Sequence, residues 1–111
     1  LLLELKRVLR PKGCMIHIVD YRDHFFKYPF HFLQFSSPVW YRYLDPGDLC
    51  RARIGDHLRA FEAHGFRAAV LAKEQDIPSL MSLKRRIHSE FQHHSLEDLA
   101  TTGAVLLAER I

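Results

Sequence analysis

The sequence predicts an α/β fold, and three observations support that prediction. Apolar side chains recur at intervals of three and four over residues 1–10, which is the spacing of one face of a helix. Pro11 and Gly13 end this helix, and the apolar run 14–19 follows as a strand that suits burial on both faces, as in a parallel sheet covered by helices. A second helix and strand follow at 54–71, so α and β elements alternate.

The remaining elements follow from turn and capping residues. Gly65 is placed to end the second helix in a left-handed conformation. Apolar residues at helical intervals after Pro78 predict another amphipathic helix, over about 78–91. Ser95 begins a short turn that resembles a capping box, and the apolar segment 104–108 closes the chain as a strand.

Composition bounds the class of protein. The 111 residues suit a single domain, and 48% hydrophobic with 26% charged residues is ordinary for a globular core. No run approaches the ~18–20 apolar residues that cross a bilayer, and nothing at the start resembles a secretory leader, so we expect a cytoplasmic protein without a membrane span. Cys14 and Cys50 lack metal-site spacing and are expected to be free thiols.

A resemblance to a known family enters at the first helix and strand. The turn between them reads Arg7-Val8-Leu9-Arg10-Pro11-Lys12-Gly13 and resembles the segment before the fifth strand of class I S-adenosylmethionine-dependent methyltransferases. That family usually has a proline and two glycines there, and Lys12 stands in place of the first glycine. The helix over 55–64 and the Gly-Phe pair after it resemble the family's next helix and the start of its sixth strand. By the same resemblance, 104–109 is the seventh strand, antiparallel between strands five and six.

The resemblance implies what the complete protein does. Residues 1–111 are expected to form the C-terminal part of one Rossmann-like methyltransferase domain, with an aromatic-rich insert at about 21–50 and a helical insert at about 76–102. The parent would transfer a methyl group from S-adenosylmethionine to a small-molecule acceptor. The family holds its cofactor on segments before the fifth strand, so no cofactor-binding residue is assigned here. We expect the chain alone to be inactive, and to self-associate or be partly disordered through an exposed sheet edge.

The best local candidate for a site follows the first strand. Ligands in open α/β sheets bind beyond the carboxyl ends of the strands, which is where Asp20 to His24 lie. His24 or Asp23 is a candidate general base, and Asp20 and Arg22 are candidates to bind the acceptor, with Arg22 orienting an anionic group. A salt-bridged turn is the other interpretation, in which Asp20 or Asp23 pairs with the arginines at 51 and 53. A metal held by Asp20, Asp23 and His24 is a third, weaker one, and no metal site is assigned.

The aromatic-rich insert holds ten of the thirteen aromatic residues within 21–43, and its second half, from about Phe30, is expected to be partly helical. It has the position of a segment that covers a substrate, and Tyr28, Trp40 and Tyr41 are the candidates to face a pocket. Packing against the sheet is the alternative for the other rings. The turn 45–48 follows, with proline and glycine at favoured positions.

A second class of function rests on the basic run Lys84-Arg85-Arg86. A non-catalytic module could use it to bind nucleic acid, whereas a solvated helix face is the ordinary explanation. The net charge of +3 is too small to favour nucleic acid by itself, so no nucleic-acid partner is expected.

Overall fold

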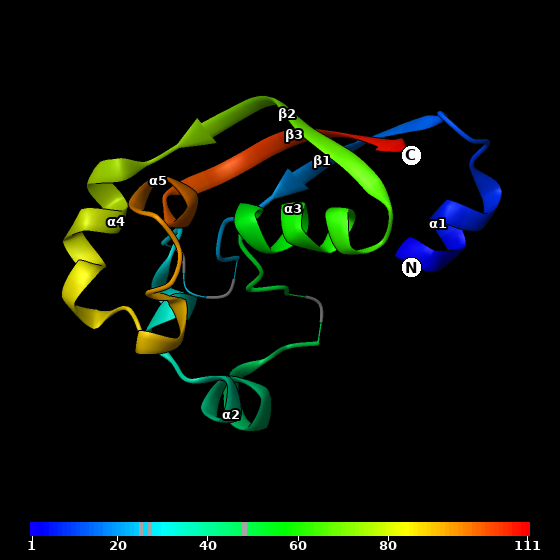
Figure 1. Cartoon of the computed structure of the whole chain (residues 1–111). Helices are drawn as coiled ribbons and strands as arrows, with labels where there is room; N and C mark the ends of the chain where they lie inside the picture. Colours follow the sequence, from blue (N-terminus) through cyan, green and yellow to red (C-terminus); the bar gives the residue numbers. More distant parts are fainter. Residues whose placement is uncertain (25, 27, 48) are drawn as a thin grey trace.

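The computed structural model describes residues 1–24, 26, 28–47 and 49–111, so Phe25, Lys27 and Asp48 of the predicted insert and turn lie outside it. Its centre is a three-stranded sheet in which β1 (Cys14–Asp20) and β2 (Phe66–Gln75) both pair with β3 (Thr101–Arg110) (Figure 1). Both pairings are antiparallel, so β1 and β2 run in the same direction on either side of β3. The prediction of a last strand between the two earlier ones, antiparallel to both, is confirmed.

Five α-helices accompany the sheet among the described residues. They are α1 (Leu2–Val8), α2 (Ser37–Val39), α3 (Ile54–Ala63), α4 (Ile77–Leu83) and α5 (Leu96–Leu99). Turns of 3-10 helix lie at His31–Gln34, Lys84–Arg86 and Ser89–Phe91, and a π-helical turn at Trp40–Leu44 continues α2. Helices α1 and α3 lie where the apolar spacing predicts them.

One hydrophobic cluster, the sheet core, lies between α3 and one face of the sheet (Figure 1). Ile54 and Phe61 of α3 are buried against Phe66 of β2 and Leu106 of β3. Gly65 connects α3 to β2 with φ of +83°, a conformation that glycine adopts without steric cost. The predicted glycine stop is therefore confirmed, and it directs Phe66 into the core.

A second cluster, the insert core, joins the two inserts to one another. Its buried members are Phe30, Phe32, Leu33, Trp40, Leu80, Leu83, Ile87, Phe91, Leu99 and Ala100. All ten come from the aromatic-rich insert at about 21–50 or from the segment at about 76–102. The two inserts, which are far apart in the sequence, therefore stabilise each other. Burial of each large apolar side chain contributes ~1.5–3 kcal/mol to the free energy of unfolding.

The sheet corrects the expectation of a first strand that is buried on both faces. Side chains of β1 alternate between partly buried and exposed, and Ile16 and Ile18 are 61% and 85% exposed. Met15 and Val19, on the other face, pack against the sheet core. The apolar run is therefore covered on one face alone in this chain, because all the strand pairs are antiparallel and α3 lies on a single side.

The predicted helix over 78–91 is also wrong in its length. The α-helix ends at Leu83, a 3-10 turn carries Lys84–Arg86, and Ile87 and His88 are extended before a further 3-10 turn. The His88 backbone N–H donates to the Leu33 carbonyl oxygen at 2.9 Å, which ties the break to the aromatic-rich insert. Leu83, Ile87 and Phe91 are all buried in the insert core despite the interruption.

Candidate functional site

The predicted site lies at the carboxyl ends of β1 and β2, beside a hollow of about 490 Å³. Asp20 of β1 and Arg22 just after it line the hollow, as do Glu74 of β2 and Asp76, which caps α4. Gly103 of β3 forms part of its floor. A second hollow of about 320 Å³, lined by Arg22, Asp23, His24 and Pro29, adjoins it through the shared Arg22 and Pro29. Sequence patterns found the first strand end and missed Glu74 and Asp76 at the second.

Asp20 binds both basic residues of the corner. The Arg22 guanidinium donates from Nε to Oδ1 at 3.1 Å and from Nη2 to Oδ2 at 3.0 Å. His24 Nε2 lies 3.0 Å from Oδ2 of the same carboxylate. The Asp20–Arg22–His24 cluster is exposed to the hollows, with 44% to 56% of each side chain accessible. Because Asp20 binds the Nε–Nη2 edge of Arg22 through both of its oxygens, the charge of Arg22 is already balanced by this carboxylate.

The hydrogen bonds of the cluster determine the charge of Asp20 and the tautomer of His24. The hydrogen bond from the Arg22 side chain holds the pKa of Asp20 well below its usual range, so this group is a carboxylate and a weak base. A carboxylate accepts hydrogen bonds, so His24 donates from Nε2 and, in the neutral ring, carries its lone pair on Nδ1. The arrangement of a histidine oriented by a carboxylate is the one that general-base catalysis uses.

Asp23 has a different position from His24. It is 5% exposed, and its carboxylate accepts the backbone N–H of Phe26 at 3.1 Å and that of Phe32 at 2.8 Å. Its own N–H donates to the Pro29 carbonyl oxygen at 2.8 Å. These bonds tie the start of the aromatic-rich insert together, so the geometry favours His24 over Asp23 as the base. Asp20, Asp23 and His24 do not converge as a set of metal ligands within the described residues.

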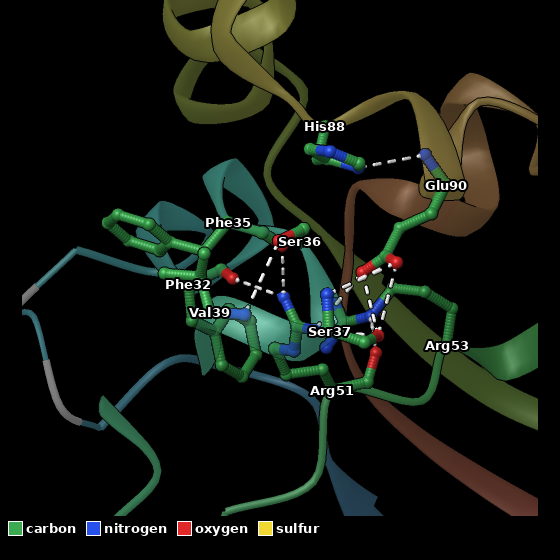
Figure 2. Close-up of polar contacts among 9 residues, drawn as sticks. All are labelled: Phe32, Phe35, Ser36, Ser37, Val39, Arg51, Arg53, His88 and Glu90. Carbon is green, nitrogen blue, oxygen red and sulfur yellow. Dashed lines mark hydrogen bonds and ion pairs between the residues drawn. The ribbon is translucent and has the colours of Figure 1, made fainter. Parts of the chain in front are cut away.

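The two arginines that sequence patterns paired with Asp20 or Asp23 are bound elsewhere. Arg51 donates from Nη2 to Glu90 Oε1 at 3.1 Å, and from Nη1 to the carbonyl oxygens of Phe32 and Phe35 (Figure 2). Arg53 is fully buried and donates to the Tyr21 carbonyl oxygen at 2.8 Å. Burial lowers the pKa of Arg53 to about 10, which leaves it charged at neutral pH. The salt-bridged turn with these arginines is therefore wrong.

The three aromatic candidates are separated by the fold. Trp40 is 0% exposed and packs edge-on against Phe32 in the insert core, so its predicted exposure to a pocket is wrong. Tyr28 is 59% exposed and lies against His31, with the ring centroids 4.6 Å apart. Tyr41 is 67% exposed and lines a separate hollow of about 340 Å³. None of the three lines the hollows beside Asp20 as the structure describes them.

The separate hollow contains a polar network that sequence patterns missed. Glu90 accepts from the Ser37 hydroxyl at 2.9 Å and from the Ser37 N–H at 3.2 Å, in addition to its ion pair with Arg51 (Figure 2). Burial raises the pKa of Glu90, but the bonds from Ser37 and the charge of Arg51 outweigh this and lower it overall. The network joins residues 39 and 53 positions apart, and no local spacing indicates such a contact.

The basic run Lys84–Arg86 is exposed on its 3-10 turn. A 3-10 helix has three residues in each turn, so consecutive side chains point in three different directions. All three residues nevertheless border one hollow of about 770 Å³, so the charge of the run is confined to a single turn. A continuous basic surface is the feature that nucleic-acid binding requires, and this segment does not build one by itself.

Within the described part of the chain, no helix combines the length and the apolar character needed to cross a bilayer. Cys14 and Cys50 are free and exposed, as expected. Comparisons of the chain with protein-family models, with curated proteins and with solved structures give no match.

Proposed function

We propose that this chain forms the acceptor side of an S-adenosylmethionine-dependent methyltransferase that acts on a small molecule. The observation that supports it is the strand arrangement: β3 lies between two strands that share a direction and is antiparallel to both. The methyltransferase resemblance implies this order for strands five, seven and six. The order is an independent support, because the resemblance rests on turn residues and the pairing rests on the fold.

The residues of this chain do not fit the cofactor itself. A nucleotide-type cofactor in such folds lies on a glycine-rich turn between a strand and the helix after it. The five glycines of the sequence are at 13, 47, 55, 65 and 103, and none follows the carboxyl end of β1 or β2. We therefore assign no residue here to S-adenosylmethionine and limit the proposal to the acceptor.

The acceptor binds, in this proposal, at the carboxyl ends of β1 and β2. The hollow there has carboxylates from Asp20, Glu74 and Asp76 against the single guanidinium of Arg22. This excess of negative charge favours a neutral or cationic acceptor, such as an alcohol or an amine, over an anion. His24 Nδ1 takes the proton that the attacking oxygen or nitrogen loses, and Asp20 holds the imidazole in the tautomer that permits it.

The test is methyl transfer by the complete gene product from methyl-labelled S-adenosylmethionine to panels of small amines, alcohols and carboxylic acids. We expect His24→Ala to lower kcat by about 100-fold or more, since a positioned base contributes ~100- to 10,000-fold, with donor affinity unchanged. His64→Gln is the matched control, because His64 bonds the Ala60 carbonyl oxygen at the opposite end of β2.

Two outcomes would contradict the proposal. One is a full rate in His24→Ala, which would make the corner structural. The other is no methyl transfer together with salt-sensitive binding of nucleic acid that is lost when Lys84, Arg85 and Arg86 are changed to Ala, which would favour a binding module.

A further inference from the structure

Three side chains with metal-binding atoms meet beside the hollow that Tyr41 lines. Asp56 comes from the first turn of α3, and His93 and His94 come from the segment between the 3-10 turn at Ser89–Phe91 and α5. One ligand atom from each of the three lies within 4.8 Å of the other two. The backbone N–H of His94 donates to the Phe91 carbonyl oxygen at 3.2 Å, which fixes where the histidine pair leaves the turn.

Two of the three atoms already have the separation of metal ligands. His94 Nε2 lies 3.3 Å from Asp56 Oδ2. Two ligands at ~2.0–2.1 Å from a tetrahedral Zn²⁺ ion are about 3.3–3.4 Å apart. The His94 side chain is 1% exposed, so its position is set by packing. His93 is exposed, so packing does not fix its ring, which lies beside that of His94 with the centroids 4.1 Å apart.

The surroundings hold the ligands in place. Asp56 Oδ2 also accepts the Arg53 backbone N–H at 2.9 Å, and Asp56 Oδ1 accepts from Arg59 Nη2 at 2.7 Å. A carboxylate has about four acceptor sites, so one on Oδ2 stays available to a cation. Outer hydrogen bonds of this kind orient the ligands of metal sites.

The second ring nitrogen of His94, Nδ1, also has surroundings that suit a metal ligand. His94 Nδ1 is buried without a hydrogen-bond partner among the described residues. A Cβ at Gly55 would lie 3.5 Å from this nitrogen and 2.9 Å from Asp98 Oδ2, so glycine leaves room for both groups. A histidine that binds a metal through Nε2 commonly donates its Nδ1–H to a nearby carboxylate. Asp98 is the carboxylate that could accept this hydrogen bond from His94.

We propose that Asp56, His93 and His94 bind a divalent transition-metal ion of the Zn²⁺ type. Two imidazoles and a carboxylate are the three protein ligands of open zinc sites, which leave a fourth position for water or a small ligand. The hollow of about 340 Å³ lies over that position and is lined by all three residues. The site is separate from the Asp20–Arg22–His24 cluster and stands whether or not the chain belongs to a methyltransferase.

The experiment titrates Co²⁺ into the chelator-treated complete gene product and follows visible absorption, with Zn²⁺ added last as competitor. We expect one saturable site with the intense bands of tetrahedral cobalt, displaced by Zn²⁺. His93→Ala should weaken Co²⁺ binding by more than about tenfold. Loss of an outer hydrogen bond already costs ~10- to 100-fold in metal affinity, and this variant removes a ligand itself. His93 is exposed, so this variant is expected to fold, and circular dichroism verifies that it does.

His24→Ala is the matched control, because His24 is also exposed and also lies 3.0 Å from a carboxylate, but has no second histidine beside it. We expect it to bind Co²⁺ as the wild type does. Gly55→Ala adds a second readout, since the new Cβ crowds Asp98 and should weaken binding without removing a ligand. Absence of tetrahedral cobalt bands in the wild type, or equal Co²⁺ affinity in His93→Ala and His24→Ala, would overturn the proposal.

Discussion

Arg51 Nη2 lies 3.1 Å from Glu90 Oε1, and this ion pair joins the end of the aromatic-rich insert to the segment before α5. The Arg51 side chain is 5% exposed and also lies over the rings of Trp40 and Phe91. It therefore connects the polar network to the insert core. Together with the hydrogen bonds from Ser37 to Glu90 and from His88 to Leu33, it joins the two inserts, which makes the pair a test of how they are held together.

Arg51→Met is expected to lower the free energy of unfolding by about 2–3 kcal/mol. The value lies below the ~3–5 kcal/mol of a fully buried pair, because 30% of the Glu90 side chain is exposed. Urea unfolding measures it. Arg7→Met is the control, because the exposed Arg7–Glu4 pair is worth at most ~0.5 kcal/mol. Equal losses in the two variants would show that burial of Arg51 adds nothing.

The turn before β1 gives a prediction about Lys12. Its φ is +63°, a left-handed conformation that costs a residue with a Cβ about 1 kcal/mol. Its backbone N–H donates to the Arg110 carbonyl oxygen at 3.0 Å, so the conformation is fixed by β3. Lys12→Gly is therefore expected to raise the free energy of unfolding by about 0.5–1 kcal/mol, while Lys12→Ala leaves it within ~0.5 kcal/mol. A gain in both variants would trace the effect to the lost charge instead.

The Tyr21–His57 contact predicts a loss of stability in mild acid. Burial lowers the pKa of His57 below its ordinary 6.5 and raises the pKa of Tyr21, so both groups are neutral at pH 7 and share a hydrogen bond of 2.6 Å between the Tyr21 hydroxyl and His57 Nδ1. The unfolded chain then binds a proton that the folded chain does not as the pH falls below about 6.5. Stability is therefore full above that pH and declines below it.

Urea unfolding at pH 7.5 and pH 5.5 measures this slope. His57→Gln should reduce it without abolishing it, because burial also lowers the pKa of His94. A slope of the opposite sign, or one that His57→Gln leaves unchanged, would refute the linkage.

The exposed face of β1 predicts that the 111-residue chain self-associates. Ile16 and Ile18 are 61% and 85% exposed on a strand whose outer edge has no partner among the described strands. Such an edge pairs readily with other chains. We expect concentration-dependent oligomers by light scattering, reduced in the double variant Ile16→Lys, Ile18→Lys. A sharp monomer at all concentrations would contradict this expectation.

The sequence predicted the parts of the fold that local chemistry determines. Apolar spacing located α1 and α3, and Gly65 located the turn into β2, because these signals act within a few residues. Ser95 caps α5 as expected, accepting the Asp98 N–H at 3.1 Å. The break after α4 and the burial of Trp40 were not predictable in this way, because both depend on contacts between the two inserts.

In the candidate sites too, residues close together in the sequence were predictable, and residues brought together by the fold were not. Asp20, Arg22 and His24 were found because they follow a recognisable strand and lie within five residues of one another. Glu74 and Asp76 also stand at a strand end, a signal that was present and unused. The meeting of Asp56 with His94 has no counterpart in sequence spacing, since the two residues come together through the packing of α3 beside α5.

We propose that this chain is part of an S-adenosylmethionine-dependent methyltransferase and supplies the acceptor side of its site. Isothermal titration calorimetry with S-adenosylmethionine tests it most directly, with the complete gene product and the 111-residue chain measured side by side. We expect saturable binding at one site by the complete product and no binding by the 111-residue chain, because none of the glycines in the chain forms a cofactor turn after β1 or β2. A folded complete product that does not bind the cofactor would contradict the claim.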